Sequence, residues 1–226
     1  QLSKKNVLAI DMDGQANLTE ALGLSIEEEQ TVYGAMCGQY TLPLVKLHNG
    51  ITVVPSCLDL SAAESELISE PGRELILKGL ITKAIAKEHF DYIIIDCSPS
   101  LGLITINALS ASDSVMIPVQ PEFFALEGLG KLLQTIRLVQ SGVNPSLTIE
   151  GFVVTMFDGR TKVHAQVVNE LKEHFQDMVF NTVIQRSIRL SEAPSHGKPI
   201  ILYDVVSNGT TNYMNLAKEV LEKNER

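Results

Sequence analysis

Three aspartates stand where two apolar runs of the sequence give way to polar turns. Asp11 and Asp13 follow the run at 6–10, and Asp96 follows the run at 92–95. Runs this rich in β-branched residues are typical of parallel strands buried on both faces. The carboxyl ends of such strands meet at one edge of the sheet, where α/β proteins bind ligands. Carboxylates fixed there could hold a metal ion or polarise a water, although a single Asp commonly only caps a helix or closes a turn.

A short basic segment stands apart from an otherwise acidic chain. The formal net charge is −9, which disfavours a histone-like coat for nucleic acid but allows a local patch. Between 183 and 199, Arg186, Arg189 and Lys198 face one acid, Glu192. Guanidinium groups grip phosphate through two hydrogen bonds, without regard to base sequence. The spacing of Arg186 and Arg189 would place both on one side of a helical turn.

The elements that must position these residues alternate between strands and helices. Strands are predicted at 6–10, 51–54, 92–95, 114–119, 149–155, 182–184 and 200–203, and helices at about 75–85, 125–140, 163–175 and 211–223. This alternation predicts an α/β fold with a mostly parallel, twisted sheet and helices on both faces. No internal repeat or linker interrupts the 226 residues, so one domain is predicted over 1–226.

Composition narrows the class of protein further. Apolar residues make up 45% of the chain, which is ample for a core. The three cysteines form no CxxC pair, which argues for a reducing cytoplasm and against disulfides or a zinc site. No run is long enough to span a membrane, and no signal-peptide pattern opens the sequence. Acids offset the bases of the last helix, so we expect its apolar stripe (Met214, Leu216, Ala217, Val220 and Leu221) to pack in the core instead of anchoring the protein to a membrane.

Six segments, in order along nearly the whole chain, resemble those of the ParA/Soj chromosome- and plasmid-partition ATPases. They are DMDGQANLT (11–19), IIIDCSPSLG (93–102), PVQPE (118–122), ALEGL (125–129), TMFDGRT (155–161) and RLSEAPSHGKP (189–199). The relatives of that family include MinD and share a P-loop α/β fold. The resemblance therefore implies a MinD/ParA-like P-loop NTPase.

One element of that family is missing from the sequence. Its phosphate loop, KGGVGKT, belongs to a strand and helix preceding 6–10, but no GxxxxGK[ST] pattern occurs in the 226 residues. The expected fold thus lacks the first strand and the P-loop. Either the sequence is a truncated part of a longer protein, or the protein has lost nucleotide binding. We favour truncation, because removing a strand from inside a sheet leaves backbone groups unpaired and an apolar slot open.

The resemblance also implies roles for the three acids. Asp13 would be the catalytic residue that positions the attacking water, Asp11 would support the magnesium shell, and Asp96 would be the Walker B carboxylate, holding Mg²⁺ through a water. Phosphoryl transfer needs such positioning and charge neutralisation more than covalent chemistry. Gly14 and Ser98 stand where relatives often carry proline. Gly14 is expected to loosen the turn that aims Asp13.

Other residues are implied to lie near ATP. They are Gln120 and Glu122 after the strand at 114–119, Met156 and Asp158 beside the base or ribose, and Pro199 with Asp204 in the same pocket. A plain surface turn is an equal alternative for Gln120 and Glu122.

Arg160 and Arg189 are implied to contact DNA, with Arg186 and Lys198 as supporting charges. The alternative is that the arginines form ordinary ion pairs with Asp158 or Glu192. No aromatic residues interleave with them, which favours double-stranded DNA, bound without sequence preference, over single strands. The resemblance further implies ATP and Mg²⁺ as cofactors of the full-length form, an ATP-dependent homodimer, a ParB-type centromere-binding partner, no membrane, and a cytoplasmic, nucleoid-associated location.

Two rival functions stay open. A nucleotide-free paralogue would bind DNA or a partner without turnover. A metabolic ATPase of the same superfamily, such as a dethiobiotin-synthetase-like enzyme, would need a substrate pocket in place of the segment at 189–199.

Overall fold

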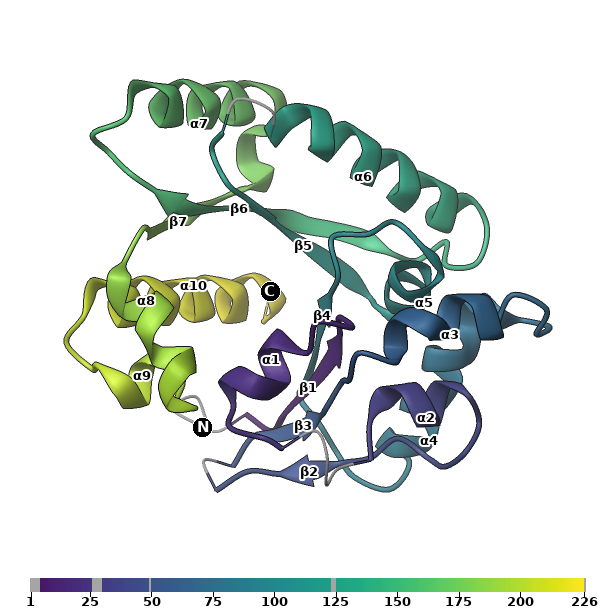
Figure 1. The fold of residues 1–226 in the computed structure, drawn as a ribbon. Coiled ribbons are helices and arrows are strands. Elements are labelled where there is room, and N and C mark those ends of the chain that lie inside the picture. The colour runs from purple at the N-terminus through teal and green to yellow at the C-terminus, as the bar shows by residue number, and fades with distance from the viewer. Residues whose placement is uncertain (1–4, 26–29, 49, 123–124, 226) are drawn as a thin grey trace. The chain divides into compact units, whose positions relative to one another are not determined.

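The computed structural model describes residues 5–25, 30–48, 50–122 and 125–225, which divide between two compact units (Figure 1). Unit 1 comprises Gln1–Ser112 with Leu138–Ser146, and unit 2 comprises Asp113–Arg137 with Leu147–Arg226. The predicted α/β class is confirmed, because every strand pairing but one is parallel. A single domain over 1–226 stays a prediction.

Unit 1 is built on a four-stranded sheet in the order β2-β3-β1-β4. Its strands are β1 (Val7–Met12), β2 (Val45–Lys46), β3 (Thr52–Val54) and β4 (Tyr92–Cys97). Strand β1 pairs in parallel with β3 and β4, whereas β2 pairs antiparallel with β3. Within the described ranges β4 pairs with β1 alone and is an edge strand. Ile94 on β4 is 59% exposed, which is unusual for an isoleucine in a strand of this composition.

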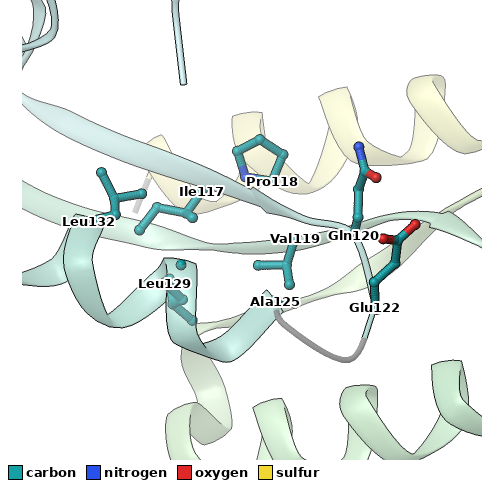
Figure 2. Close-up of a pocket in the computed structure, with 9 residues that line it drawn as sticks. Ile117, Pro118, Val119, Gln120, Glu122, Ala125, Leu129 and Leu132 are labelled. Atoms are coloured by element: carbon teal, nitrogen blue, oxygen red, sulfur yellow. The ribbon is translucent and has the colours of Figure 1, made fainter. Parts of the chain in front are cut away.

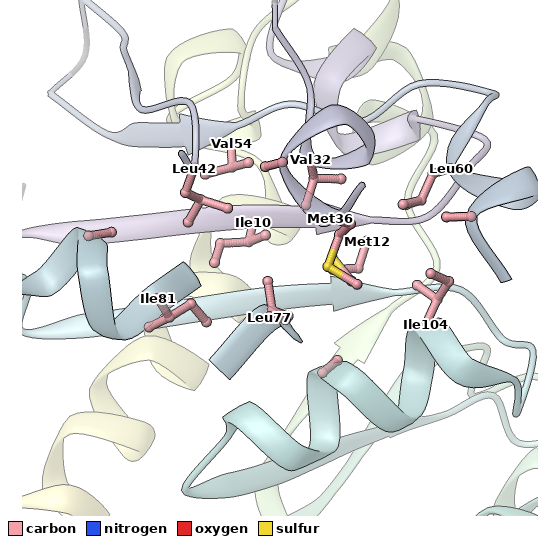
Figure 3. Packing of buried hydrophobic residues seen from close by; sticks show 14 of the residues in the cluster. Ile10, Met12, Val32, Met36, Leu42, Val54, Leu60, Leu77, Ile81 and Ile104 are labelled. Carbon is pink, nitrogen blue, oxygen red and sulfur yellow. The ribbon is translucent and has the colours of Figure 1, made fainter. Parts of the chain in front are cut away.

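The described part of this unit also contains the helices α1 (Asn17–Ala21), α2 (Val32–Met36), α3 (Leu60–Glu66), α4 (Ile76–Ile85) and α5 (Leu103–Ala111), with a 3-10 turn η1 (Arg73–Leu75) before α4. Alternate side chains of β1 enter one apolar cluster with residues of α2 to α5. Figure 3 shows Ile10 and Met12 among Met36, Leu77 and Ile104. Burial of side chains of this size contributes about 1.5–3 kcal/mol each, so this cluster holds β1 firmly in register.

Unit 2 is built on a parallel sheet in the order β5-β6-β7. The strands are β5 (Ser114–Val119), β6 (Thr148–Phe157) and β7 (Val179–Gln185). Helices α6 (Ala125–Ser141) and α7 (Lys162–Phe175) lie on one face and α10 (Asn208–Asn224) on the other (Figure 1). Leu216 and Val220 of α10 pack against the core, as predicted, but Met214 of the same stripe is 41% exposed. Shorter helices complete the unit: η2 (Gln176–Met178), α8 (Ile188–Glu192), η3 (Ala193–His196) and α9 (Ile200–Tyr203).

Strand β6 carries two bulges. The pairing of Val115 with Ile149 is followed by that of Met116 with Gly151, so one residue of β6 is extra. Gly151 has φ 154°, and a Cβ there would collide with the carbonyl oxygen of Met178, so only glycine fits. The second irregularity precedes Phe157 and contains Met156, a non-glycine residue at φ 51°. Bulges of this kind re-aim the chain that follows, which here is the turn at 158–161.

Strand β7 has a third irregularity, and a helix residue compensates for it. Between its pairings at Val179 and Val183, β7 advances four residues while β6 advances from 152 to 154. The Glu219 carboxylate of α10 accepts hydrogen bonds from the backbone N–H groups of Asn181 and Thr182 at 2.8 and 2.9 Å, and from Thr182 Oγ1 at 2.7 Å. Backbone donors that the bulge frees from the ladder are satisfied in this way.

The predicted strand at 200–203 is wrong. The segment is the helical turn α9, in which Tyr203 N–H bonds Pro199 O and Asp204 N–H bonds Ile200 O. Pro199 precedes the turn in extended conformation, and a four-residue run with no neighbouring strand satisfies its backbone only by coiling. The predicted helix at 211–223 begins earlier, at Asn208, because Ser207 caps it through Thr210 N–H at 3.2 Å.

Candidate functional site

The two strand ends that carry acids lie side by side in unit 1. Strands β1 and β4 run parallel, and their register pairs Ile10 with Ile95 and Asp11 with Asp96. Because both strands reach the same edge, the carboxylates of Asp11, Asp13 and Asp96 are close enough to interact electrostatically. The predicted convergence of three acids is therefore present.

Asp11 is fully buried and belongs to a hydrogen-bond network. Its Oδ1 accepts from Asp13 N–H at 3.1 Å. Its Oδ2 accepts from Thr19 N–H at 2.9 Å and from Thr19 Oγ1 at 2.7 Å. Thr19 Oγ1 in turn accepts from Ser56 N–H at 2.9 Å. Both oxygens of Asp11 are hydrogen-bonded, so this side chain fixes the conformation of the turn that carries Asp13.

Asp13 sits in a tight turn fixed from two sides. Its carboxylate accepts from Gln15 N–H at 3.0 Å, and its carbonyl accepts from Ala16 N–H at 2.9 Å. Gly14 is buried against α3, where a Cβ would collide with Ser61 Oγ. The close approach of Ser61 explains why a residue without a Cβ stands at this position, and the looser turn stays a prediction.

Asp96 is the exposed member of the trio. Partial loss of hydration raises the pKa of its carboxyl group, and the negative charges of Asp11 and then Asp13 raise it further. The pKa of the neighbouring Cys97 thiol is raised to about 12. Desolvation is the largest cause, and the negative charges of Asp96 and Asp13 add to it. A site with this excess of negative charge favours a cation beside Asp96.

The donor set suits magnesium held mainly through water. No group of three or more His, Cys, Asp or Glu side chains in the described part of the chain could hold a metal by itself. Mg²⁺ commonly keeps several waters and takes one or two carboxylates plus phosphate oxygens. Asp96, which is exposed, can supply such a carboxylate. Ser56 Oγ, buried and unpaired among the described residues, leaves one further polar atom for a bound water.

Gln120 and Glu122 lie at the polar end of a pocket in unit 2. The pocket has a volume of about 360 Å³ and opens between β5 and α6. Figure 2 shows the two polar side chains at one end and Ile117, Leu129 and Leu132 towards the other. A polar rim on an apolar pocket is the usual character of a small-molecule site.

The turn after β6 presents Met156 and holds Arg160. Met156 is 53% exposed. Arg160 Nε and Nη2 donate to Asp158 Oδ1 and Oδ2 at 2.9 and 2.7 Å, which is a bidentate ion pair. Asp158 N–H donates to His164 Nδ1 at 3.0 Å. The hydrogen bonds from Arg160 hold the pKa of Asp158 far below its usual range.

Arg189 is paired as well. Its Nη1 donates to Glu192 Oε2 at 2.9 Å, and its Nε lies 3.4 Å from Asp204 Oδ2. Glu192 Oε2 also accepts from Tyr203 Oη at 3.1 Å. Tyr203 stacks on His196 with ring centroids 5.0 Å apart. The ion pairs anticipated as the alternative for Arg160 and Arg189 are therefore both formed.

The other basic residues differ. Arg186 lies before α8, which begins at Ile188 after the extended Ser187, so the expected shared helical side with Arg189 does not exist. Its backbone N–H instead bonds Phe157 O at 3.0 Å, which joins it to the Arg160 turn. Arg186 and Lys198 are exposed, and no described carboxylate forms an ion pair with either.

The structure brings the three acids together, but it places the residues expected near ATP in unit 2 on three different segments. Gln120 and Glu122 follow β5, Met156 and Asp158 end β6, and Pro199 with Asp204 flanks α9.

Sequence reasoning missed Thr19, Ser56, His164 and Tyr203. Their roles depend on contacts across turns and strands that no spacing rule reveals. Within the described ranges no helix has the length and apolar content that a membrane crossing needs.

Comparisons with known proteins agree with this geometry. The AAA domain family model matches residues 1–149. The sporulation initiation inhibitor protein Soj of Bacillus subtilis is 50% identical over 96% of this chain and 86% of its own length. The chromosome-partitioning ATPase Soj of Treponema pallidum is 44% identical over 98% of this chain and 87% of its own.

Solved structures match over nearly the whole chain. Cobyrinic acid a,c-diamide synthase from Mycobacterium smegmatis, bound to an ATP analogue and magnesium, has a TM-score of 0.83 and 31% identity, covering 97% of this chain and 83% of its own. A Borrelia burgdorferi protein described as a plasmid partition protein, bound to AMPPNP, has a TM-score of 0.81 and 25% identity, covering 98% and 88%. MinD of Pyrococcus furiosus, at 23% identity and a TM-score of 0.77, shares the fold.

Proposed function

This chain belongs to the Soj/ParA family of chromosome-partitioning ATPases, and from that premise we propose that the full-length protein hydrolyses ATP to move DNA during segregation. The observation that carries the proposal is the register of β1 and β4, which sets Asp11 beside Asp96 at one sheet edge. That arrangement is the one a magnesium-bound phosphate needs in a P-loop fold.

The three acids take separate parts in this proposal. Bound ATP and Mg²⁺ supply the phosphoryl group and the cation that neutralises its charge. Asp96, which is exposed at the sheet edge, would hold the metal through a water. Asp13 would orient the attacking water. Asp11, buried and saturated with hydrogen bonds, keeps Asp13 in position and supports the metal shell indirectly.

Further residues are assigned to nucleotide binding by family resemblance. Gln120 and Glu122 line the polar end of the pocket beside β5, and we assign Met156 and Pro199 to the base or ribose by family resemblance. Asp158 is assigned beside the base or ribose as well, and both of its oxygens bind Arg160.

Double-stranded DNA is the proposed binding partner. Arg160 and Arg189, with Arg186 and Lys198 as supporting charges, would contact phosphates without reading bases. An ATP-bridged homodimer would present two such surfaces, so that binding becomes tight through their combination. A ParB-type partner would stimulate hydrolysis and release the dimer.

Two rival functions remain. One is a nucleotide-free binding module, which ATP binding by the full-length protein tests. The resemblance to a solved structure named as a diamide synthase favours a metabolic ATPase. We prefer partition, because the relatives named for chromosome partitioning are 40–44% identical and the synthase is 31% identical.

Hydrolysis tests the enzymatic part. The full-length protein should hydrolyse ATP with Mg²⁺, and Asp13→Ala should retain ATP binding while turnover falls by about 100-fold or more, the usual range for removing a group that acts on the proton or the water. Asp59→Ala, an exposed acid at the start of α3, is the matched control. Turnover by Asp13→Ala equal to wild type would remove Asp13 from the mechanism, and absence of ATP binding by the wild-type full-length protein would favour the binding module.

Salt dependence tests the DNA part. Arg189→Glu should weaken binding to duplexes of unrelated sequence alike and lower the slope of log affinity against log salt by about 1. Arg137 is an exposed residue of α6, and Arg137→Glu makes the same charge change there. This variant should leave the slope unchanged. An equal effect of both variants would show that Arg189 affects DNA binding only through the net charge of the protein and does not contact a phosphate.

A further inference from the structure

The two arginines proposed to contact DNA are both already occupied by carboxylates of their own segments. Arg160 forms a bidentate pair with Asp158, two residues earlier, and Arg189 pairs with Glu192, three residues later. Arg186 and Lys198, the other cations proposed for this surface, have no carboxylate partner in the described part of the chain. Among these four basic residues, Arg160 and Arg189 are therefore the two that form ion pairs with carboxylates.

The carboxylates are more firmly held than the arginines. The Arg160 side chain is 91% exposed and that of Asp158 is 20% exposed. Asp158 is anchored by its backbone N–H to His164 Nδ1, and its Oδ1 also accepts Arg160 N–H at 3.0 Å. The acceptor is thus fixed in the turn, whereas the guanidinium group is free to leave.

Glu192 is anchored in a comparable way. Tyr203 Oη donates to the same Oε2 that Arg189 binds, and Tyr203 is itself stacked on His196. Asp204 also contacts Arg189, with Oδ2 3.4 Å from Nε. Arg189 therefore has two carboxylate partners, and the nearer one, Glu192, also accepts a hydrogen bond from Tyr203.

A carboxylate and a phosphate compete for the same face of a guanidinium group. Both accept two parallel N–H bonds, and the bidentate contact uses Nε and one Nη. Arg160 already directs Nε and Nη2 at Asp158. A phosphate that takes the same face must displace the carboxylate, and because exposed ion pairs are weak the exchange costs little.

We propose that Asp158 and Glu192 set the duplex affinity of this protein, because each competes with DNA phosphate for its arginine. The proposal rests on the proposed duplex binding. Each protomer then binds DNA somewhat less tightly than it would with unpaired arginines, because each arginine must first leave its carboxylate. Raised pKa values of both guanidinium groups, caused first by these hydrogen bonds, agree with the pairing.

The test uses the full-length protein and a fluorescently labelled duplex, titrated over a salt series. Asp158→Asn and, independently, Glu192→Gln should each tighten binding about two- to five-fold, the range that an exposed ion pair is worth. Glu173→Gln on exposed α7 removes the same charge without freeing an arginine and should change binding less than either variant. Circular dichroism and thermal melting verify that each variant is folded.

A double-mutant cycle identifies the cause. The gain from Asp158→Asn should disappear in an Arg160→Ala background, and the gain from Glu192→Gln in an Arg189→Ala background. Weaker or unchanged binding by both carboxylate variants, with weaker binding by the arginine variants, would overturn the competition while duplex binding stands. Unchanged binding by Arg160→Ala and Arg189→Ala would instead show that the proposed DNA surface itself is wrong.

Discussion

Thr19 donates both its backbone N–H and its hydroxyl to one oxygen of Asp11, at 2.9 and 2.7 Å. The same hydroxyl accepts from Ser56 N–H, so one side chain connects α1, the end of β1 and the residue after Pro55. All three groups are buried. A buried network of this kind is costly to break, because each orphaned group loses water without gaining a partner.

We therefore expect Thr19→Val to lower the free energy of unfolding by about 1–3 kcal/mol, since the isosteric side chain leaves Ser56 N–H unpaired and Asp11 with one bond fewer. Urea unfolding of the full-length protein measures the change. Thr82→Val on α4, whose exposed hydroxyl bonds only Lys78 O, is the control and should change stability by under about 0.5 kcal/mol. Equal effects of the two substitutions would contradict a structural role for the network.

Asp96→Asn is expected to stabilise the protein while it impairs nucleotide hydrolysis. The raised pKa of Asp96 means that the fold disfavours its charged form. Stability from this group is complete below its unfolded pKa of about 3.9 and is lost as pH rises through the higher folded value. The neutral amide removes that loss at pH 7. Because the side chain is exposed, the gain is limited to about 1 kcal/mol or less.

Thermal melting at about pH 3.5, below the unfolded pKa, and at pH 8, both without magnesium, checks this expectation. The advantage of Asp96→Asn over wild type should be larger at pH 8, and Asp59→Asn should show no such difference. A melting temperature of Asp96→Asn below that of wild type at pH 8 would contradict the repulsion between Asp96 and its neighbouring acids.

Glu219→Ala should destabilise unit 2 by about 1–3 kcal/mol, because it leaves backbone donors of Asn181 and Thr182 without an acceptor. Desolvation opposes ionisation of Glu219, but the hydrogen bonds from Asn181 and Thr182 outweigh it and lower the pKa. Its contribution is thus present above the unfolded pKa of about 4.3 and is lost as pH falls through the folded value.

The control for Glu219 is Glu222→Ala, also on α10, which breaks only an exposed contact of 3.8 Å with Lys218. Denaturant unfolding at pH 7 should separate the two variants clearly. At pH 3 the difference between wild type and Glu219→Ala should shrink. A difference that persists undiminished at low pH would show that the carboxylate charge is unimportant there.

The Cys97 thiol should react slowly. Its pKa is about 12, against about 8.5 for a free cysteine, so at pH 8 the reactive thiolate is suppressed by about 100-fold or more. Iodoacetamide labelling followed by peptide mass spectrometry measures its rate in the folded protein and in urea. A folded rate within a few-fold of the rate in urea would contradict the proposed burial and the charge of Asp96.

Sequence patterns predicted the elements whose stability is local or whose apolar runs are long. The runs at 92–95 and 114–119 form β4 and β5, as predicted, because runs rich in β-branched residues strongly favour the strand conformation. Helix α5 was not predicted, because buried residues such as Thr105, Asn107 and Leu109 lie on several sides of the helix and leave no exposed polar stripe. Strand β2 spans only Val45–Lys46 and exists through its pairing with β3, which no local pattern encodes.

The candidate site was predictable to the extent that it depends on strand ends. Asp11 and Asp96 were located because parallel strands deliver their last residues to one edge. The partners that fix them were not, because Thr19 reaches Asp11 across eight residues and Ser56 belongs to another strand end. The ion pairs of Arg160 and Arg189 were foreseen as an alternative, but the anchoring of their acceptors by His164 and Tyr203 required the fold.

In unit 1, the edge of β4 away from β1 has no paired strand among the described residues. An unpaired strand edge offers amide and carbonyl groups to which another extended segment can add by hydrogen bonding. A segment that added along Tyr92–Cys97 would lie next to Asp96, so strand addition at this edge and access to the acidic residue are linked.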